Sequence, residues 1–361
     1  MIGRTLFTYF LRRYLVIAMQ FFLGLLILTY LIDFAELVRR VSGLPGYSIF
    51  LAMAISALRI PVIVQQTLPF VILFAAMSTL MLLNRKYELV VARSAGVSAW
   101  QFLLPLCVGS LLIGLVGVTV FNTFAARALT YSEEIESQFR GGVRASDRGR
   151  LPWLKQRTEE GATIVGAKST ARRGLLLNDA TFLRFDKQGT INERLDARSA
   201  VLGAGAWELT DVVRIDSDGN RSTLATARVA SDLKPEFVEE QFARPESIPL
   251  LELREKIAAA QSFGMSSYPF AMQYHSLLAL PWLLVAMTLI AATVSMRFAR
   301  LGQSAAMILG GILAGFLLYV LSELVKAFGS AGVMPPVVAA WIPVVLATFF
   351  GVTFLLHKED G

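Results

Sequence analysis

Hydrophobic residues along the chain are concentrated in six long stretches that contain no Lys, Arg, Asp or Glu. Three of these stretches precede residue 127, and three follow residue 267. A transmembrane helix needs about 20 mostly apolar residues, so the pattern predicts six membrane-spanning helices in two groups of three. The predicted spans are Tyr14–Ile32, Pro61–Leu83, Trp100–Ala126, Tyr268–Met296, Leu301–Ser322 and Ala327–Leu356.

Two stretches near the N-terminus need a closer look. The first span resembles a signal peptide, but it is longer than the roughly 7–15 apolar residues of a signal core, and the Asp33-Phe34-Ala35-Glu36 that follows is a poor cleavage site. We therefore interpret it as a retained anchor. Val41–Leu58 is also uncharged, but it contains Gly43, Pro45 and Gly46, so we expect a loop and a short helix at the membrane rim.

The middle of the chain has the alternating polar and apolar positions that are typical of β-strands. Short strands separated by turns rich in Asp and Gly favour a sandwich or a jelly roll, and Pro249–Gln261 has the period of a closing helix. We predict an α+β membrane protein in which two membrane halves, 1–126 and 268–361, flank an inserted β-jellyroll-like domain, 127–267. The predicted strands are Thr181–Phe185, Thr190–Leu195, Ala206–Thr210, Val212–Ile215 and Thr223–Val229.

The composition agrees with a membrane protein and excludes several classes of site. Hydrophobic residues make up 55% of the 361 residues and charged residues 17%, against roughly 25% charged residues in soluble domains. The single cysteine, Cys107, allows no internal disulfide and no multi-cysteine metal site. The middle segment 127–267 contains neither His nor Cys, which weakens a catalytic role for it.

The charges orient the chain in the membrane. The segment from Arg127 to Lys256 has 21 basic and 21 acidic residues, so the net charge of +7 comes from the membrane halves. With the N-terminus in the cytoplasm, the inner loops and ends hold nine basic and three acidic residues, and the short outer loops hold four and three. This distribution follows the positive-inside rule. It predicts a multi-pass protein with both termini in the cytoplasm and the middle domain outside.

Three weaker motifs have ordinary structural explanations. Gly161–Ser169 nearly matches a phosphate-binding loop, but its spacing has one residue too many, and a strand with a polar face explains it better. Gly311 and Gly315 form a GxxxG pair, which serves close helix packing within the chain or with a partner. His275 is either a proton-relay group or a structural residue at the end of its span. We expect any ATP to be used by a separate subunit.

The segment between spans two and three, Asn84–Gly96, favours a short helix that ends at Gly96. This helix has two interpretations. It either lies on the lipid surface as an amphipathic stretch, or it docks a cytosolic partner, with Glu88 offered to an arginine of that partner. The residues alone do not favour one of these over the other.

The outer end of span one carries a cluster of charges. Its members are Asp33, Glu36, Arg39 and Arg40. They either form a solvated helix end with internal ion pairs, or they hold a phosphate group of an amphiphile at the outer rim of the membrane. The second interpretation follows from the planar guanidinium of arginine, which suits bidentate phosphate contacts.

At these two motifs the chain resembles the LptF/LptG family of lipopolysaccharide export permeases. Tyr87–Val91 followed by Ser94-Ala95-Gly96 resembles the cytoplasmic helix of that family, and Ile32–Arg40 is similar to the end of the first span in its LptG branch. Gly315–Leu321 and Gly332–Pro336 are also closer to that branch. The layout of three plus three spans around a β domain matches too, so the resemblance covers essentially the whole chain.

The resemblance implies a function and partners. It implies a permease subunit of an ABC-type exporter that extracts lipopolysaccharide from the bacterial inner membrane and passes it to a periplasmic bridge during outer-membrane biogenesis. The implied partners are an LptF-like permease, an LptB-like ATPase dimer, and LptC-like and LptA-like periplasmic proteins. It implies no catalysis and no bound cofactor in this chain, because ATP hydrolysis belongs to the ATPase.

The resemblance also implies roles for individual residues. Tyr87, Glu88 and Arg93 are expected to couple the chain to the ATPase. Arg39 and Arg40 are expected to meet the lipid's phosphates, whereas Asp33, where some relatives carry a lysine, would repel a phosphate unless pairing with arginine hides its charge. The residues expected at the lipid are Asp33, Phe34, Glu36, Arg39, Arg40, Phe70, Phe316 and Tyr319, with Phe21 among those that line a cavity for its acyl chains.

Two alternatives stay open at this point. The first is a permease for another lipid or for a lipoprotein, which the lipid that copurifies would distinguish. The second is a membrane-anchored enzyme or sensor with a catalytic outer domain. Such a domain would need metal ligands or a nucleophile with its base, and without His or Cys in 127–267 it would have to rely on carboxylates.

Overall fold

The computed structural model describes residues 3–41, 48–139, 154–158, 161–171, 175–186, 190–203, 205–217, 219–231, 244–262, 266–295 and 305–359. The chain forms two compact units. The helical unit comprises Met1–Arg40, Ile49–Ser132 and Pro245–Gly361, and the second unit comprises Val41–Ser48 and Glu133–Arg244. The predicted domain bounds, 127 and 267, stay a prediction. The compact units divide at 132/133 and 244/245.

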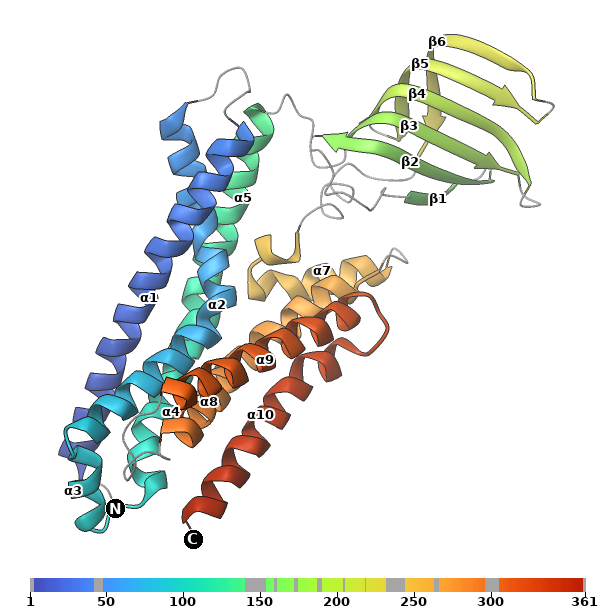
Figure 1. Ribbon diagram of the computed structural model, residues 1–361. Coiled ribbons are helices and arrows are strands. Elements are labelled where there is room, and N and C mark those ends of the chain that lie inside the picture. Colours follow the sequence, from blue (N-terminus) through green and yellow to red (C-terminus); the bar gives the residue numbers. More distant parts are fainter. Residues whose placement is uncertain are drawn as a thin grey trace. The chain divides into compact units, whose positions relative to one another are not determined.

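The helical unit contains the long apolar helices that the hydrophobic pattern predicts (Figure 1). Among the described residues, six helices are long and apolar enough to cross a membrane, three before the sheet and three after it. This confirms the predicted arrangement of spans. Their elements are α1 (Arg4–Val41), α2 (Ile49–Arg85), α4 (Ala99–Val116) continued by a π-helical turn (Gly117–Phe121) into α5 (Asn122–Phe139), α8 (Tyr268–Ser295), α9 (Ala305–Ser330) and α10 (Pro336–Glu359).

Several helices are longer than the uncharged stretches that predict them, and α1, for example, extends from Arg4 to Val41. α2 begins at Ile49, so the stretch expected to form a separate rim helix is its first part, and the expected loop at 42–47 lies outside the described residues. Pro61 and Pro69 lie inside this helix, because neighbouring helices can satisfy the backbone groups that a proline frees. α5 continues past Ala126 to Phe139, since its polar last turns keep the helical period.

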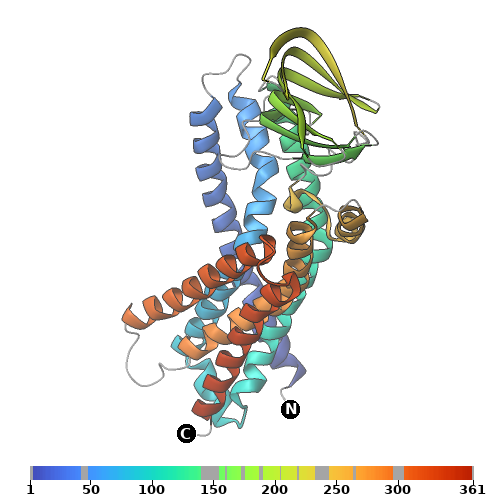
Figure 2. The same cartoon turned by 90° about the vertical axis from the view of Figure 1, so that its right-hand side faces the viewer.

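Helix α8 lies in the middle of the unit and packs against α2, α4 and α10. Glycine permits its closest approach to α4: a Cβ added at Gly114 would lie 2.5 Å from the Cα of Pro281. By contrast, α1 lies at the edge of the unit (Figures 1 and 2). Among its described side chains, the buried ones are Phe10, Tyr14, Ala18 and Leu37, so α1 packs at its two ends more than along its middle.

The second unit is built around an antiparallel sheet. Its described strands pair in sequence order, as a meander, where a sandwich would have two sheets. The predicted strands are all found, and Ala206–Thr210 and Val212–Ile215 form one strand. An inserted antiparallel β domain is thereby confirmed. The strands are β1 (Leu154–Thr158), β2 (Gly161–Ala171), β3 (Leu176–Phe185), β4 (Ile191–Gly203), β5 (Ala206–Asp216) and β6 (Arg221–Ala230).

A row of irregular positions crosses this sheet. Asp179 and Asp211 adopt φ values of 47° and 54°, and Arg198 of the strand between them is opposite both. The alternation of buried and exposed positions shifts by one residue there. In β3, for example, the buried positions are odd-numbered up to Leu177 and even-numbered from Ala180. Because the irregularities are in register, the apolar face stays continuous across the row. It contains Val165, Ala167, Leu177, Ala180, Phe182, Leu195, Ala197, Ala200, Leu202, Trp207, Leu209, Val212 and Val229.

The predicted closing helix is present as α7 (Leu250–Ser262) and belongs to the helical unit. Its first backbone N–H, at Leu250, donates to the Asn122 side-chain oxygen at 3.0 Å, and the hydroxyl of Thr130 donates to the Ser247 carbonyl at 3.2 Å. These bonds join the start of α7 to α5. The segment that returns the chain to span four is therefore held on the helices.

Candidate functional site

A groove of about 510 Å³ lies between α1 and α2. Two of the aromatic residues predicted to line an acyl-chain cavity, Phe21 and Phe70, are in its wall. The ring of Phe21 also stacks on Phe74, with centroids 6.1 Å apart. The wall is mainly apolar, as a site for hydrocarbon chains requires. The residues that line it are Gln20, Phe21, Gly24, Leu25, Leu28, Phe70, Val71 and Phe74.

The other predicted aromatic residues are not in the wall of this groove. Tyr319 of α9 packs against Phe70 of α2, with ring centroids 4.7 Å apart, so one contact joins span five to the groove. Phe316, one turn earlier on α9, is exposed. Phe34 stacks on Tyr30 along α1, with centroids 6.1 Å apart. The prediction of a cavity lined by all three spans stays a prediction.

The charged cluster at the C-terminal end of α1 contains an ion pair that the sequence did not indicate. The carboxylate of Asp33 lies 3.8 Å from the guanidinium of Arg59 on α2, and the hydroxyl of Ser56 donates to its other oxygen at 2.5 Å. The side chains of Asp33 and Arg59 are only 14% and 20% exposed. Arg59 therefore offsets the negative charge of Asp33, and it does so from span two rather than from the neighbouring arginines.

The remaining members of the cluster are on the last turns of α1. Arg39 and Glu36 are exposed, and between them Leu37 is buried. The backbone of Arg40 is helical, and its side chain lies outside the described side chains. The described part of the rim thus combines a neutralised acid, Asp33, with an exposed cation at Arg39.

The short helix predicted between spans two and three is present as α3 (Glu88–Ser94). It ends as expected, because Gly96 adopts a φ of 84° and its N–H donates to the Arg93 carbonyl at 2.9 Å. Tyr87 precedes the helix with a φ of 58° and is 71% exposed. The guanidinium of Arg93 lies over the ring of Phe102, 5.8 Å from its centroid.

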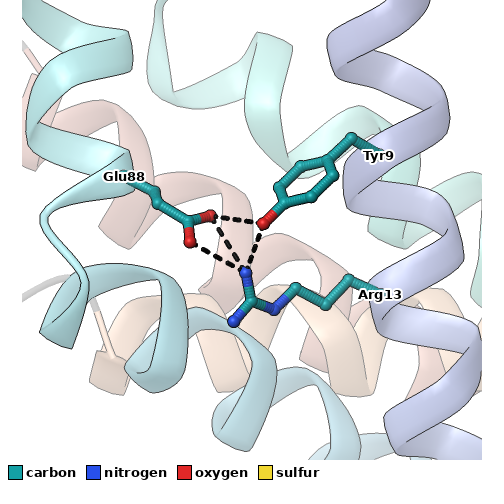
Figure 3. Close-up of polar contacts among 3 residues, drawn as sticks. All are labelled: Tyr9, Arg13 and Glu88. Atoms are coloured by element: carbon teal, nitrogen blue, oxygen red, sulfur yellow. Dashed lines mark hydrogen bonds and ion pairs between the residues drawn. The ribbon is translucent and has the colours of Figure 1, made fainter.

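Glu88 has partners within the chain (Figure 3). A guanidinium nitrogen of Arg13 on α1 donates to both carboxylate oxygens, at 2.9 and 3.1 Å, and the Tyr9 hydroxyl donates to one of them at 3.0 Å. Neither Tyr9 nor Arg13 was among the predicted site residues. The sequence indicates Arg13 only as a basic residue near the N-terminus, because a contact between positions 75 residues apart leaves no local signal.

Buried hydrogen bonds between helices form a further polar group that the sequence did not indicate. Tyr14, Ser110 and Thr288 are fully buried, and their hydroxyls form a chain with two 2.6 Å steps. This chain joins α1, α4 and α8. At the start of α5, the Asn122 side chain donates to the Gln65 side-chain oxygen of α2 at 3.4 Å. Each of these residues looks like an isolated polar interruption of an apolar run, and only the fold brings them together.

Of the weaker motifs, the segment that nearly matches a phosphate-binding loop is a strand, as expected, and the two interpretations of His275 and of the GxxxG pair stay open. Gly161–Ser169 lies in β2, which pairs with strands on both sides. Gly315 is buried against Leu73 of α2. The surroundings of Gly311 are outside what the structure describes. His275 forms an edge contact with the Tyr274 ring, with centroids 5.2 Å apart.

Comparison with known proteins agrees with this geometry. A family model described as lipopolysaccharide export system permease LptF/LptG matches residues 8–357, which is nearly the whole chain. The chain is also 25% identical, over 354 residues, to the lipopolysaccharide export system permease protein LptG of Haemophilus influenzae. That match covers 92% of this chain and 93% of the relative. The similarity therefore includes both helical parts and the sheet between them.

Proposed function

The chain belongs to the LptF/LptG family of lipopolysaccharide export system permeases, and from that premise we propose that it is the LptG-type subunit, which extracts lipopolysaccharide from the inner membrane and passes it to a periplasmic bridge. Permeases of this family are non-catalytic transmembrane subunits without a bound cofactor, and ATP is hydrolysed by a separate subunit. The similarity to a full-length relative named LptG supports the choice of branch.

The groove between α1 and α2 is the observation that carries this proposal. Its apolar wall gives acyl chains a place at membrane depth. Hydrocarbon gains little by moving from lipid to an apolar wall, but each methylene exposed to water would cost about 0.8 kcal/mol. A protein that removes a lipid with several chains from a bilayer must therefore shelter them, and an ATP-driven change of the groove would release them. In this proposal Phe21 and Phe70 belong to the apolar wall, and Tyr319 supports Phe70 from α9. Phe34 and Phe316 would meet the lipid outside this wall.

The rim cluster would receive the headgroup. The Asp33–Arg59 pair supports this role, because it removes the repulsion that a lone carboxylate would exert on a phosphate. Arg39 would then face the lipid's phosphates as an exposed cation, with Arg40 beside it in the chain. Glu36 is the remaining acid of the cluster and would adjust the local charge. Electrostatic attraction at such a partly dry rim is less screened by salt than it is in bulk water.

Helix α3 would be the site at which the ATPase docks. Its exposed surface includes Tyr87, Val90 and Val91, and an aromatic residue with apolar neighbours is typical of the centre of an interface. Glu88 and Arg93 would complete the docking surface as charged groups. In this proposal α3 and both chain termini are in the cytoplasm, and the sheet is in the periplasm. The proposed partners are an LptF-like permease, an LptB-like ATPase dimer, and LptC-like and LptA-like proteins.

The proposal is tested by reconstituting the complex in vesicles that contain lipopolysaccharide and measuring its transfer to a soluble periplasmic acceptor. Transfer is expected to require ATP and all membrane subunits. The variant Phe21→Ser should reduce transfer, because it places a polar group in the groove wall. Transfer that proceeds equally without this chain would contradict the proposal.

A further inference from the structure

The contact of Glu88 with α1 has the geometry of a fixed joint rather than of a chance surface pair. One guanidinium nitrogen of Arg13 meets both carboxylate oxygens of Glu88, and the Tyr9 hydroxyl bonds both partners, at 2.5 Å to Arg13 and 3.0 Å to Glu88 (Figure 3). The side chains of Arg13 and Glu88 are only 16% and 27% exposed. Such partly desolvated, charge-assisted bonds are stronger than those of exposed pairs.

The two sides of α3 differ in what they contact. Leu89 and Ala92 are buried, and α3 packs on α2. Tyr87 and Val91 are exposed. Glu88, at the first position of the helix, is the described side chain that bonds α3 to α1. A force applied to the exposed side of α3 therefore reaches span two through apolar packing and span one through Glu88.

The inner end of α1 is itself held in the helical unit. Tyr14, the residue next to Arg13, is fully buried, and its hydroxyl bonds Ser110, which in turn bonds Thr288. Phe10 and Ala18, on the same face of α1, are buried as well. Toward the outer end, the same helix lines the groove with Phe21, Gly24 and Leu28. One helix thus carries the joint, its anchor and part of the groove wall.

We propose that Arg13 is a positioning residue that couples α3 to span one, so that a movement of α3 is transmitted through Glu88 and Arg13 to the groove wall on α1. This inference rests on the proposed function, because it takes α3 to be the helix that the ATPase moves. Tyr9 holds the guanidinium in place, and the buried hydroxyl chain at Tyr14 provides the point about which α1 moves.

The test uses the complete complex in vesicles and measures three quantities: the ATPase subunit that copurifies, the rate of ATP hydrolysis, and the lipopolysaccharide transferred per ATP. In Arg13→Ala we expect the ATPase still to copurify and the lipopolysaccharide transferred per ATP to fall by about tenfold. That factor corresponds to a typical coupling energy between contacting residues. Arg12→Ala is the matched control, because Arg12 is adjacent and exposed, and it should behave as the unaltered chain. Tyr9→Phe should cause a smaller loss than Arg13→Ala.

A charge exchange separates coupling from simple loss of structure. Arg13→Glu and Glu88→Arg should each lose transfer per ATP, and the double variant should recover most of it, because the pair is restored with its charges reversed. Normal transfer per ATP in Arg13→Ala would overturn the inference. So would loss of ATPase binding in that variant, or a double variant that binds the ATPase but transfers no more lipopolysaccharide per ATP than the single ones. ATPase binding is measured in every variant, because Glu88 is also proposed to take part in docking.

A failure of the proposed docking role would be visible separately. Tyr87→Ala alters the exposed side of α3 and leaves the Arg13–Glu88 pair in place. Unchanged ATPase binding in Tyr87→Ala, with reduced transfer per ATP in Arg13→Ala, would argue against docking through Tyr87 while supporting the joint. Reduced ATPase binding in Tyr87→Ala with normal transfer per ATP in Arg13→Ala would support docking and overturn the joint.

Discussion

At the scale of single residues, Asp33 shows how an acid can lie at a rim that is proposed to meet phosphates. Its charge is offset by Arg59, and its second oxygen accepts from Ser56. Replacing Arg59 by Ala leaves a partly buried carboxylate without its cation, so we expect the free energy of unfolding to fall by about 1–2 kcal/mol. Thermal unfolding of the solubilised chain measures this, and adding Asp33→Asn to Arg59→Ala should recover most of the loss. An unchanged midpoint in Arg59→Ala would contradict the pairing.

Arg39 and Arg40 have a different expected effect. Adjacent helical residues point about 100° apart, so the two cations cannot both face one acid, and at least one should be available to a phosphate. We expect Arg39→Glu/Arg40→Glu to reduce photo-crosslinking of lipopolysaccharide to the rim while assembly and basal ATP hydrolysis persist. Normal crosslinking would mean that the arginines only finish the helix. Failed assembly would instead assign them a structural role.

The sequence indicated candidate site residues where a short motif contains them. It did not indicate their contact partners, which lie far away in the chain. The motif around Glu88 and the charges at the end of span one were visible as short patterns. The contacts of Glu88 with Arg13 and of Asp33 with Arg59 depend on how helices cross, which no local pattern encodes. The same holds for Tyr14, Ser110 and Thr288, whose hydroxyls are far apart in sequence and meet only in the folded unit.

At the scale of elements, the contact of α4 with α8 depends on a missing side chain. A Cβ at position 114 would lie 2.5 Å from the backbone of Pro281, which cannot move aside cheaply. We expect Gly114→Ala to lower the free energy of unfolding by about 1–3 kcal/mol, as overpacking does. Gly310→Ala in α9 is the control, because an added Cβ there has open space and alanine favours a helix. Equal thermal stability of the two variants would contradict this packing.

The hydrophobic pattern predicted the existence of every span, but not where the helices end. α2 and α5 run beyond their uncharged stretches, because a helix in contact with other helices continues for as long as its backbone bonds are satisfied. In the sheet, alternation identified the strands on both sides of Asp211 and could not show that one strand continues through its irregular position. The start of α7 was visible in the sequence, whereas its bond to Asn122 was not.

For the whole molecule, the division into two compact units leads us to expect that the sheet unit folds without the helical unit. The sheet has a continuous core centred on Trp207 and Phe182, both fully buried, whereas α7 and most of α5 belong with the helices. We therefore expect Glu133–Arg244, secreted to the periplasm, to fold as a soluble β-rich domain without a disulfide. Its far-UV circular dichroism spectrum and a cooperative thermal transition check this. A spectrum dominated by helix or by disorder would contradict it.

We propose that this permease carries lipopolysaccharide as part of a larger complex. The most direct measurement is purification of the intact complex through a tag on this chain, followed by mass spectrometry of its proteins and of the lipid bound to it. We expect a second permease of the same family, an ATPase dimer, and lipopolysaccharide enriched over the phospholipids of the membrane. Recovery of a lipoprotein or of a phospholipid as the enriched cargo would contradict it.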